Sequence, residues 1–303
     1  MSVNLSIIIP VYNSENGIKD TLDSIIKQNL PEEKKLTIEV IVVDNNSSDN
    51  TFNIAKIYCK KNKFIRIFRQ NEIQGSYASR NFGEKKSTGE FLLFIDADMI
   101  LEKNVLKYIF IEIDKSKLDY AAFNVKMKLS SNSLTSKMNF LRGFNIENSI
   151  KYHNYTPTCA LLVSRTVFKH VHGFNSKLES GGDFVFGVKV FQNNFKQSYF
   201  DHILLFHPTR TAYKSLISKS NRVARGNVQL AIENPNKYLY LYKRHFKLSN
   251  LKPKNPFSIQ RVLKENNLNF RLVDFFISPF FHIPISLIRM LHAKNFYKLN
   301  TEK

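Results

Sequence analysis

The 303-residue sequence is poor in cysteine, glycine and proline, and it has no long apolar run. Cys59 and Cys159 lie far apart without Cys-x-x-Cys or Cys/His spacing, which excludes a disulfide scaffold and makes a reducing compartment the expected environment. The 10 glycines and 9 prolines exclude a collagen-like or proline-rich protein. Without about eighteen consecutive uncharged apolar residues, a membrane-spanning helix is not expected. The N-terminal MSVNLSIIIPVYN lacks the basic start and cleavage site of a signal peptide.

The composition is that of a globular protein, with 43% hydrophobic and 23% charged residues. A chain of this length is expected to form one large or two small domains. The net charge is +20, and residues 210–303 hold 18 basic and only 4 acidic residues. Such a surplus indicates an anionic partner. A bias toward Lys, Asn and Ile, as AT-rich genomes produce, is an alternative source of the charge.

The first hundred residues alternate between short apolar runs and segments with helical spacing. Leu5–Val11 is a largely β-branched run, typical of a strand buried on both faces. Ser14 follows it at the position of a helix N-cap. The strand pattern recurs at 38–43, 64–68 and 91–95, with a helix expected before each recurrence. This order predicts an α/β fold with an open parallel sheet and right-handed crossovers.

Beyond residue 101 the alternation is looser. From Ala212 onward the spacing is mostly helical, with Pro235, Pro253 and Pro256 breaking the helices. Between these points we expect strands at 120–129, 158–163 and 198–206, and helices at 134–150 and within 179–191.

Three polar turns follow strands of the predicted sheet, at 10–13, 44–49 and 96–98. The carboxyl ends of parallel strands share one edge of a sheet, and ligands bind beyond that edge. We therefore expect the three turns to be neighbours in space and to form the binding site.

Carboxylates dominate two of these turns. Asp96 and Asp98 are two residues apart and could present hard oxygen ligands to Mg²⁺ or Mn²⁺, which would neutralise a diphosphate leaving group. The alternative is an ordinary strand-end turn with solvated acids, but the buried strand before it and the neighbouring turns favour the metal. Asp44 could accept hydrogen bonds from a ribose or a base, with a helix-capping turn as the alternative.

Three further segments carry candidate residues. Arg80 lies in GSYASRNFG (75–83), where small residues would let it reach a nucleotide; a surface helix is the alternative, and no GxGxxG motif or P-loop is present. Asp183 follows two glycines and could take a proton from a hydroxyl, although a helix N-cap is favoured for this segment taken alone. His207 ends a strand and could contact a metal or phosphate, or simply be packed.

Four stretches, in this order, resemble the inverting, nucleotide-sugar-dependent glycosyltransferases of family 2. They are SIIIPVYNS (6–14), EVIVVDNNSSDNTF (39–52), ASRNFGE (78–84) and GEFLLFIDADMI (89–100). Weaker matches follow at VHGFNS (171–176), SGGDFVFGV (180–188) and HPTR (207–210). The resemblance implies a GT-A fold, which is a Rossmann-like, mostly parallel open sheet flanked by helices. It extends to about residue 226, which implies a catalytic domain of residues 1–226 and a basic, mostly helical extension of residues 227–303.

The resemblance also implies roles for the matching residues. Those that would contact the nucleotide are Pro10, Tyr12, Asn13, Asp44 (through the base), Arg80 and Asp96, whereas Asp98 would hold the metal and His207 would contact the metal or a phosphate. Asp183 falls where the family places its catalytic base, usually the second residue of a Glu-Asp pair. Here Gly182 precedes it, so nearby Glu179 stays a second candidate.

These roles imply a single displacement that inverts the anomeric carbon. Asp183 would deprotonate an acceptor hydroxyl, while Mn²⁺ or Mg²⁺ and positive groups would stabilise the departing diphosphate. The expected donor is a UDP-sugar, by family frequency alone. The expected acceptor is a saccharide or lipid-linked hydroxyl of a polysaccharide, glycolipid or glycoprotein glycan, as in cell-envelope biosynthesis.

The apolar segment Phe270–Leu291, FRLVDFFISPFFHIPISLIRML, is interrupted by charges and prolines. It suits a membrane interface beside basic residues or a helical hairpin packed on the core, and the surrounding positive charge slightly favours the interface. Arg222 and Arg225 could likewise face a diphosphate or lipid phosphate, or form a solvated basic face. The expected location is cytoplasmic, with peripheral contact to an anionic membrane surface on the inner face of the plasma membrane.

Three other functions are alternatives. A nucleotidyltransferase of similar architecture would need a basic phosphate loop after the first strand, and residues 12–17 have no basic side chain. A nucleic-acid-binding protein is suggested by the +20 charge and the 13% aromatic residues. No such motif is present, however, and acids at the expected rim would repel a phosphate backbone, so we expect no nucleic acid as partner. An inactive scaffold of the same fold is disfavoured, because the acids expected at the active site are present in the sequence.

Overall fold

The computed structural model describes residues 4–30, 37–115, 117–269 and 271–301. The chain divides into two compact units. Unit 1 comprises Met1–Lys126, Phe144–Lys177 and Gly182–His207, and unit 2 comprises Met127–Gly143, Leu178–Gly181 and Pro208–Lys303. The predicted boundary after residue 226 separates a catalytic domain from an extension. The two units are defined by packing and not by catalysis, so this boundary stays a prediction.

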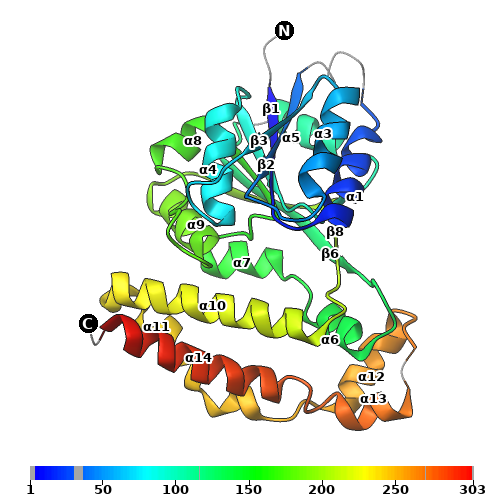
Figure 1. Ribbon diagram of the computed structural model, residues 1–303, viewed down its shortest axis with the longest axis vertical. Coiled ribbons are helices and arrows are strands. Elements are labelled where there is room, and N and C mark those ends of the chain that lie inside the picture. Colours follow the sequence, from blue (N-terminus) through cyan, green and yellow to red (C-terminus); the bar gives the residue numbers. More distant parts are fainter. Residues whose placement is uncertain (1–3, 31–36, 116, 270, 302–303) are drawn as a thin grey trace. The chain divides into compact units, whose positions relative to one another are not determined.

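Unit 1 is built on a sheet whose first half is parallel (Figure 1). The strands of this half are β1 (Leu5–Val11), β2 (Ile38–Asp44), β3 (Ile65–Arg69) and β4 (Phe91–Ile95), and the helices between them include α1 (Glu15–Ile26), α3 (Thr51–Lys61) and α4 (Ser76–Lys86). β1 lies between β2 and β4, and β3 pairs with β2; all three pairings are parallel. The α/β alternation predicted for the first hundred residues is confirmed.

The second half of the sheet is antiparallel where its pairings are resolved. β4 pairs with β7, β7 with β6, and β8 with β5, in the overall order β3-β2-β1-β4-β7-β6-β8-β5. The elements of this half are β5 (Ile100–Leu101), α5 (Val105–Lys115), β6 (Tyr120–Lys128), α7 (Ile146–His153), β7 (Ala160–Ser164), α8 (Arg165–His170), α9 (Gly182–Gln192) and β8 (Gln197–Pro208). The three strands predicted here are confirmed, whereas β5, α5 and α8 were not predicted.

One prediction, a single helix over residues 134–150, was wrong. The segment forms two helices, α6 (Leu134–Arg142) and α7. Gly143 between them adopts a φ of 48°, and a residue in the left-handed region ends a helix. Asn145 then caps α7, because its Oδ1 accepts a hydrogen bond from Asn148 N at 3.3 Å.

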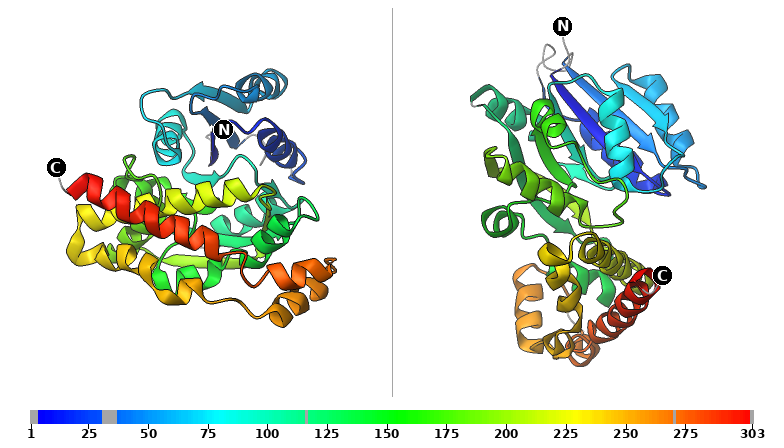
Figure 2. Two further views of the ribbon diagram at one scale, coloured as in Figure 1. Left: turned by 60° about the horizontal axis from the view of Figure 1, so that its bottom comes forward. Right: turned by 90° about the vertical axis from the view of Figure 1, so that its left-hand side faces the viewer.

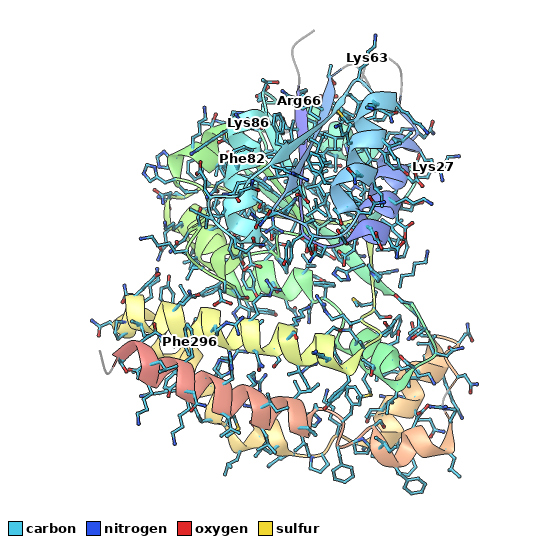
Figure 3. All side chains as sticks on the ribbon, viewed as in Figure 1. Lys27, Lys63, Arg66, Phe82, Lys86 and Phe296 are labelled. Carbon is cyan, nitrogen blue, oxygen red and sulfur yellow. The ribbon has the colours of Figure 1, made fainter. Side chains whose placement is uncertain are left out.

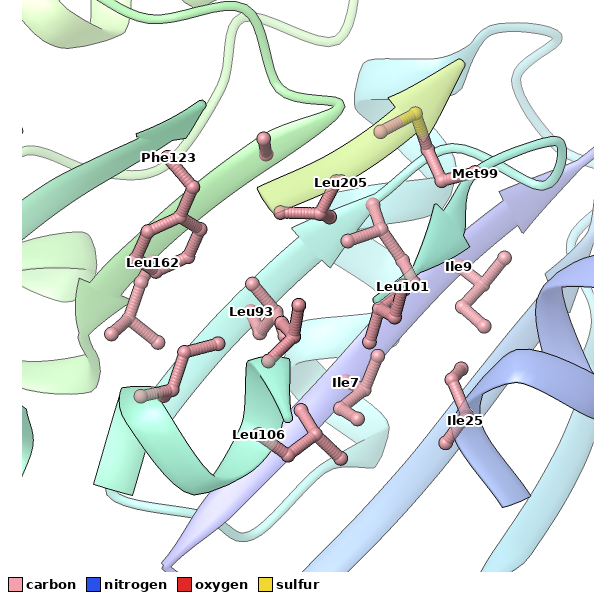
Figure 4. Close-up of a cluster of buried hydrophobic side chains, with 14 of the residues drawn as sticks. Ile7, Ile9, Ile25, Leu93, Met99, Leu101, Leu106, Phe123, Leu162 and Leu205 are labelled. Atoms are coloured by element: carbon pink, nitrogen blue, oxygen red, sulfur yellow. The ribbon is translucent and has the colours of Figure 1, made fainter. Parts of the chain in front are cut away.

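The core of unit 1 is made by strands that are buried along their whole length. All seven residues of β1 and all seven of β2 are buried, which is why these strands are continuous apolar runs rather than alternating ones. Figure 4 shows part of this core, where Ile7 and Ile9 of β1 lie near Leu93 of β4 and Leu101 of β5. Burial of each such side chain contributes about 1.5–3 kcal/mol.

Unit 2 is mostly helical. Besides α6 it holds α10 (Tyr213–Glu233), α11 (Pro235–Lys243), α12 (Pro256–Glu265), α13 (Leu272–Ile277), α14 (Ile283–Thr301) and the 3-10 turns η1 (Arg244–Phe246) and η2 (Leu248–Leu251). α10 packs along α11 and α14 (Figure 2), and Phe296 of α14 packs with Ala224 and Val228 of α10 (Figure 3). Pro235 and Pro256 each begin a helix, so the predicted breaks at these prolines are confirmed.

The apolar segment singled out near the C-terminus forms α13 and the first half of α14, and Phe270 lies outside the described residues. Lys137 of α6 and Asp274 of α13 form a buried ion pair with a distance of 3.1 Å between Nζ and Oδ2. Among the residues that the structure describes, no helix is both long enough and apolar enough to cross a membrane.

Helix α4 lies close to the sheet of unit 1 because Gly83 has no side chain. A Cβ there would lie 2.5 Å from Ile8 Cγ2 and 3.2 Å from Val43 Cγ2. Ile8 and Val43 are fully buried strand residues, so neither can move aside in a close-packed interior.

We expect Gly83→Ala to lower the free energy of unfolding by about 1–3 kcal/mol, because the added methyl group overpacks this contact. Urea unfolding followed by circular dichroism measures the change. Lys85→Ala, at an exposed position of α4, is the matched control and should change the free energy by less than about 0.5 kcal/mol. An unchanged unfolding midpoint for Gly83→Ala would contradict the close approach of α4.

Candidate active site

Asn13 joins the polar turns that follow β1 and β2. The last residues of the two strands, Val11 and Asp44, are register partners. Asn13 N donates a hydrogen bond to Ser47 Oγ at 3.0 Å, and Ser48 N donates to Asn13 Oδ1 at 2.8 Å. Asn13 has a φ of 47°, which asparagine tolerates better than most residues. These two turns are therefore neighbours, as predicted.

The third turn, Asp96–Asp98, is positioned by helices on both sides. A Cβ at Gly17 of α1 would lie 2.8 Å from Ala97 O and 3.1 Å from Asp98 Cβ, so only a glycine permits this approach. Arg80 of α4 forms an ion pair with Asp96 through Nη2 and Oδ1. The helices that follow β1 and β3 thus hold the turn that follows β4.

Asp96, Asp98 and His207 form a group with the spacing of metal ligands. One ligand atom from each residue lies within 4.8 Å of the others. His207 Nε2 is 3.8 Å from Asp98 Oδ1, and the His207 ring packs against Phe144 with a centroid distance of 5.3 Å. Carboxylate oxygens and imidazole nitrogens fit Mn²⁺, and the carboxylates also fit Mg²⁺. The sequence assigned Asp98 and His207 to the metal and Asp96 to the nucleotide, and the structure brings all three together.

Asp44 presents an acceptor that the protein leaves unused. The residue is fully buried at the end of β2. Its Oδ2 accepts a hydrogen bond from Ser47 N at 3.2 Å and lies 3.9 Å from Arg69 Nε. Its Oδ1 is buried and has no hydrogen-bond partner among the described residues. A buried acceptor without a partner is costly, and an N–H donor of a nucleotide base would satisfy it.

Asp183 lies in the first turn of α9, one residue past its start, so it does not occupy the N-cap position. Its Oδ1 accepts hydrogen bonds from Phe184 N at 2.9 Å and from the Tyr77 hydroxyl at 3.2 Å. Burial raises the pKa of Asp183, although both hydrogen bonds and the positive charge of Arg80 oppose the increase. A carboxylate whose pKa is moved toward neutrality is a better general base than a solvated one.

The pKa of the buried Cys159 thiol is affected by the charges of Arg80 and of the three acids described above. Burial raises the pKa of Cys159 well above its usual value, and the negative charges of Asp96, Asp183 and Asp98 raise it further, whereas Arg80 lowers it. The contacts agree with this: Arg80, the partner of Asp96, lies over the Tyr77 ring at 5.7 Å from its centroid, and the Tyr77 hydroxyl donates to Asp183. Asp183 is therefore connected through two side chains to the group of possible metal ligands.

Gly182 departs from the Glu-Asp pair of the family because Tyr77 occupies the space of that side chain. A Cβ at Gly182 would lie 2.8 to 2.9 Å from three carbon atoms of the Tyr77 ring. The ring also packs on Phe174, with centroids 5.7 Å apart. Where the family has an acid at the position of Gly182, this chain has no side chain, and the ring of Tyr77 fills the space. The Tyr77 hydroxyl donates to Asp183.

Glu179, the alternative base, lies in unit 2 and is bound by Arg225. Arg225 Nη2 and Nε lie 2.6 and 2.7 Å from Glu179 Oε2, and Arg225 Nη1 lies 2.9 Å from His292 Nε2. Both contacts go to the same oxygen of Glu179, so Arg225 occupies Oε2 and holds this carboxylate within unit 2. Arg222, the other arginine singled out, donates to Glu179 O at 3.4 Å.

The other predicted nucleotide contacts lie at the same end of β1. Pro10 is buried in β1 opposite Val43, and Tyr12 is 55% exposed in the turn that follows. Sequence reasoning missed Gly17, Arg69 and Tyr77. Of the three, Tyr77 alone carried a signal, since it is one of two aromatic residues in the 75–83 segment.

Comparisons with known proteins agree with this geometry. The family model described as "Glycosyl transferase family 2" matches residues 6–171. Glycosyltransferase AglE of Haloferax volcanii is 30% identical over 227 residues, which are 75% of this chain and 73% of that protein. The poly(ribitol-phosphate) β-N-acetylglucosaminyltransferase TarS of Staphylococcus aureus is 32% identical over 166 residues, which are 55% of this chain but 26% of that protein.

Solved structures have the same fold at low sequence identity. A mannosyltransferase from Pyrobaculum calidifontis, solved with GDP-mannose and Mn²⁺, has a TM-score of 0.65 at 15% identity and covers 99% of this chain and 88% of its own. TarS residues 1–349, solved with UDP-GlcNAc, have a TM-score of 0.58 at 23% identity. The match covers 99% of this chain and 91% of that TarS chain. These neighbours confirm the expected GT-A fold.

The matched residues include the three polar turns, Arg80 and both acids of the Asp96–Asp98 turn, so the family match and the site rest on the same part of the chain. This agreement favours glycosyl transfer over the nucleotidyltransferase and nucleic-acid-binding alternatives. The chain belongs to glycosyl transferase family 2 and is a glycosyltransferase.

Proposed function

We propose that this glycosyltransferase moves a sugar from a nucleotide diphosphate donor to an acceptor hydroxyl in one inverting, metal-assisted displacement. The observation that carries the proposal is that the two turn carboxylates and His207 form a ligand group, which Arg80 and Tyr77 connect to the partly buried Asp183. A metal group beside a separate base is what a single displacement requires, because the leaving group and the nucleophile are activated independently.

Asp96, Asp98 and His207 would hold a divalent ion, Mn²⁺ or Mg²⁺. When bound, such an ion supplies Lewis-acid stabilisation of the diphosphate as it leaves. Arg80 orients Asp96, and the buried Nε of Arg80 has no hydrogen-bond partner among the described residues. That N–H is a donor of suitable charge for an oxygen of the donor substrate.

We propose a UDP-sugar as donor, with Pro10, Tyr12, Asn13 and Asp44 at the nucleoside. Asp44 Oδ1 is the acceptor that a base N–H would satisfy. The bound molecules of the two structural neighbours, UDP-GlcNAc and GDP-mannose, both carry such an N–H. Arg80 and Asp96 would contact the nucleotide nearer its phosphates.

Asp183 would act as the base. Its raised pKa suits proton abstraction, and the Tyr77 hydroxyl fixes the carboxylate by donating to Oδ1. The remaining oxygen, Oδ2, would receive the proton of the acceptor hydroxyl, which attacks the anomeric carbon from the side opposite the diphosphate.

We propose a saccharide or lipid-linked acceptor of the cell envelope, since the chain resembles an enzyme that acts on poly(ribitol-phosphate). Residues 1–226 would form the catalytic domain, and the basic extension, 227–303, would keep the enzyme at an anionic membrane surface. This corresponds to a cytoplasmic enzyme bound peripherally to the inner face of the plasma membrane, with no nucleic acid as partner.

We expect Asp98→Asn to lower kcat/KM by about 10²-fold or more, because the ion that stabilises the leaving group loses a charged ligand. The measurement is turnover of a screened nucleotide sugar over a range of Mn²⁺ concentrations, with EDTA as the zero point. Asp20→Asn, at an exposed position of α1, is the matched control. Wild-type metal dependence in Asp98→Asn would contradict the metal assignment.

We expect Asp183→Asn to lower kcat by about 10²–10⁴-fold, the range for loss of a general base. Glu179→Gln should stay within about tenfold of wild type, because its partner Arg225 holds it in a structural role. Steady-state rates with a confirmed donor and acceptor compare the two variants. The opposite ranking would assign the base to Glu179.

We expect Tyr77→Phe to move the acid limb of the kcat/KM profile to higher pH. The lost hydrogen bond stabilises the charged carboxylate, so its removal raises the pKa of Asp183 further; the active form is the deprotonated one, and activity then falls at a higher pH. Tyr152→Phe, at an exposed position of α7, is the control. If Tyr77→Phe lowers the rate equally at every pH and the acid limb stays at the same pH, Tyr77 has only a packing role.

A further inference from the structure

Helix α10 binds the short segment 178–181, which immediately precedes α9. Arg225 Nε and Nη2 lie 2.7 and 2.6 Å from Glu179 Oε2. Arg222 Nη1 donates to Glu179 O at 3.4 Å, and Glu179 N donates to Gln229 Oε1 at 3.0 Å. One helix therefore holds the side chain, the carbonyl and the amide of the same residue, whereas an ordinary surface ion pair holds a side chain only.

The backbone of this segment also lies directly against α10. A Cβ at Gly226 would lie 2.3 Å from Ser180 O and 2.8 Å from Ser180 C. Gly226 is inside α10, where glycine is less stable than alanine by about 0.5–1 kcal/mol. The close approach of Ser180 gives a physical reason for a glycine at this position. Gly181 follows with a φ of 84°, and a Cβ there would lie 3.1 Å from Leu230 Cδ1 of the same helix.

Arg225 is itself held by His292 of α14. Arg225 Nη1 is 2.9 Å from His292 Nε2. Burial and the charge of Arg225 lower the pKa of His292, although the charge of Glu179 opposes them, so the imidazole is neutral at neutral pH. A guanidinium has no acceptor atom, so Nε2 of the neutral ring accepts this hydrogen bond. α10 and α14 pack along each other, and together they support the segment 178–181.

The supported segment leads within a few residues to the candidate base. α9 begins at Gly182, and Asp183 lies in its first turn, three residues beyond Ser180. Successive Cα atoms are a fixed distance apart, so a displacement of Ser180 is passed along the chain to the start of α9. The Asp183 carboxylate accepts from the Tyr77 hydroxyl at 3.2 Å, and a catalytic group misplaced by about 1 Å loses about 10²-fold in rate.

We propose that Arg225 and Gly226 are positioning residues, which hold the segment 178–181 on α10 so that Asp183 meets the acceptor hydroxyl in a fixed geometry. The inference rests on the proposed function, because it requires Asp183 as the base. The link is the peptide chain that joins Ser180 to Asp183.

Two members of the support, Gln229 and His292, lie beyond residue 226. The basic extension would therefore have a role besides membrane contact, since it would fix the geometry of the base. This role requires no lipid, so it is measured in solution.

The first test is Gly226→Ala, whose methyl group would move the Ser180 backbone by about 1 Å to reach van der Waals distance. We expect kcat to fall by about 10–100-fold, with the KM of the sugar donor within about twofold of wild type. Ser218→Ala, at an exposed position of α10, is the matched control and should keep both constants. A wild-type kcat, or a donor KM raised as much as kcat is lowered, would overturn the inference.

A double variant separates the positioning of Asp183 from general damage to the enzyme. Asp183→Asn leaves no base to be positioned, so adding Gly226→Ala should lower its residual rate by less than about twofold. A second loss as large as that of Gly226→Ala alone would overturn the inference. A wild-type rate for Asp183→Asn would overturn the proposed function and this inference with it, whereas a slow Asp183→Asn beside an unimpaired Gly226→Ala would overturn the inference alone.

Arg225→Gln tests the same support through a side chain, and it replaces Gly226→Ala if that variant melts early. We expect kcat to fall about tenfold, with partial recovery in Arg225→Lys, which keeps the charge. Lys214→Gln removes the same charge at an exposed position of α10 and should leave kcat unchanged. Glu179→Gln retains an oxygen that Arg225 can bind, so its effect should be smaller. Equal rates for Arg225→Gln and Lys214→Gln, at equal melting temperatures, would overturn the inference.

Discussion

The ion pair between Arg80 and Asp96 is the contact on which the candidate site depends. Arg80 of α4 is 2% exposed, whereas the side chain of Asp96 is 37% exposed. It pairs with Asp96, and its charge also opposes the rise in the pKa of Asp183. A positive charge among neighbouring carboxylates offsets their mutual repulsion, so Arg80 favours the gathering of acids at this turn.

The exchange at positions 182 and 77 shows how one sequence departure is compensated by structure. The ring of Tyr77 fills the space that a side chain at Gly182 would need. Its hydroxyl then bonds the carboxylate of Asp183. An acid at position 182 would have raised the pKa of Asp183 by repulsion, whereas a hydroxyl donor lowers it. Burial and this hydrogen bond therefore act on the pKa of Asp183 in opposite directions.

The sequence alone determined the parallel half of the sheet and the edge at which its polar turns meet, because fully buried strands such as Leu5–Val11 leave a continuous apolar pattern and parallel strands end at one edge. It also identified Asp44, Asp98, Asp183 and His207 as candidates. It located β6, β7 and β8 but not their antiparallel pairing, and it missed β5, whose two residues are too few for a period.

Only the tertiary structure decided which side chains act together. That Asp96 joins Asp98 and His207, that Tyr77 lies 106 residues from its partner Asp183, and that Arg225 binds Glu179 are contacts between distant segments. Local patterns carry no record of such contacts, because a side chain's partners are set by how helices and strands pack and not by the residues beside it in the chain.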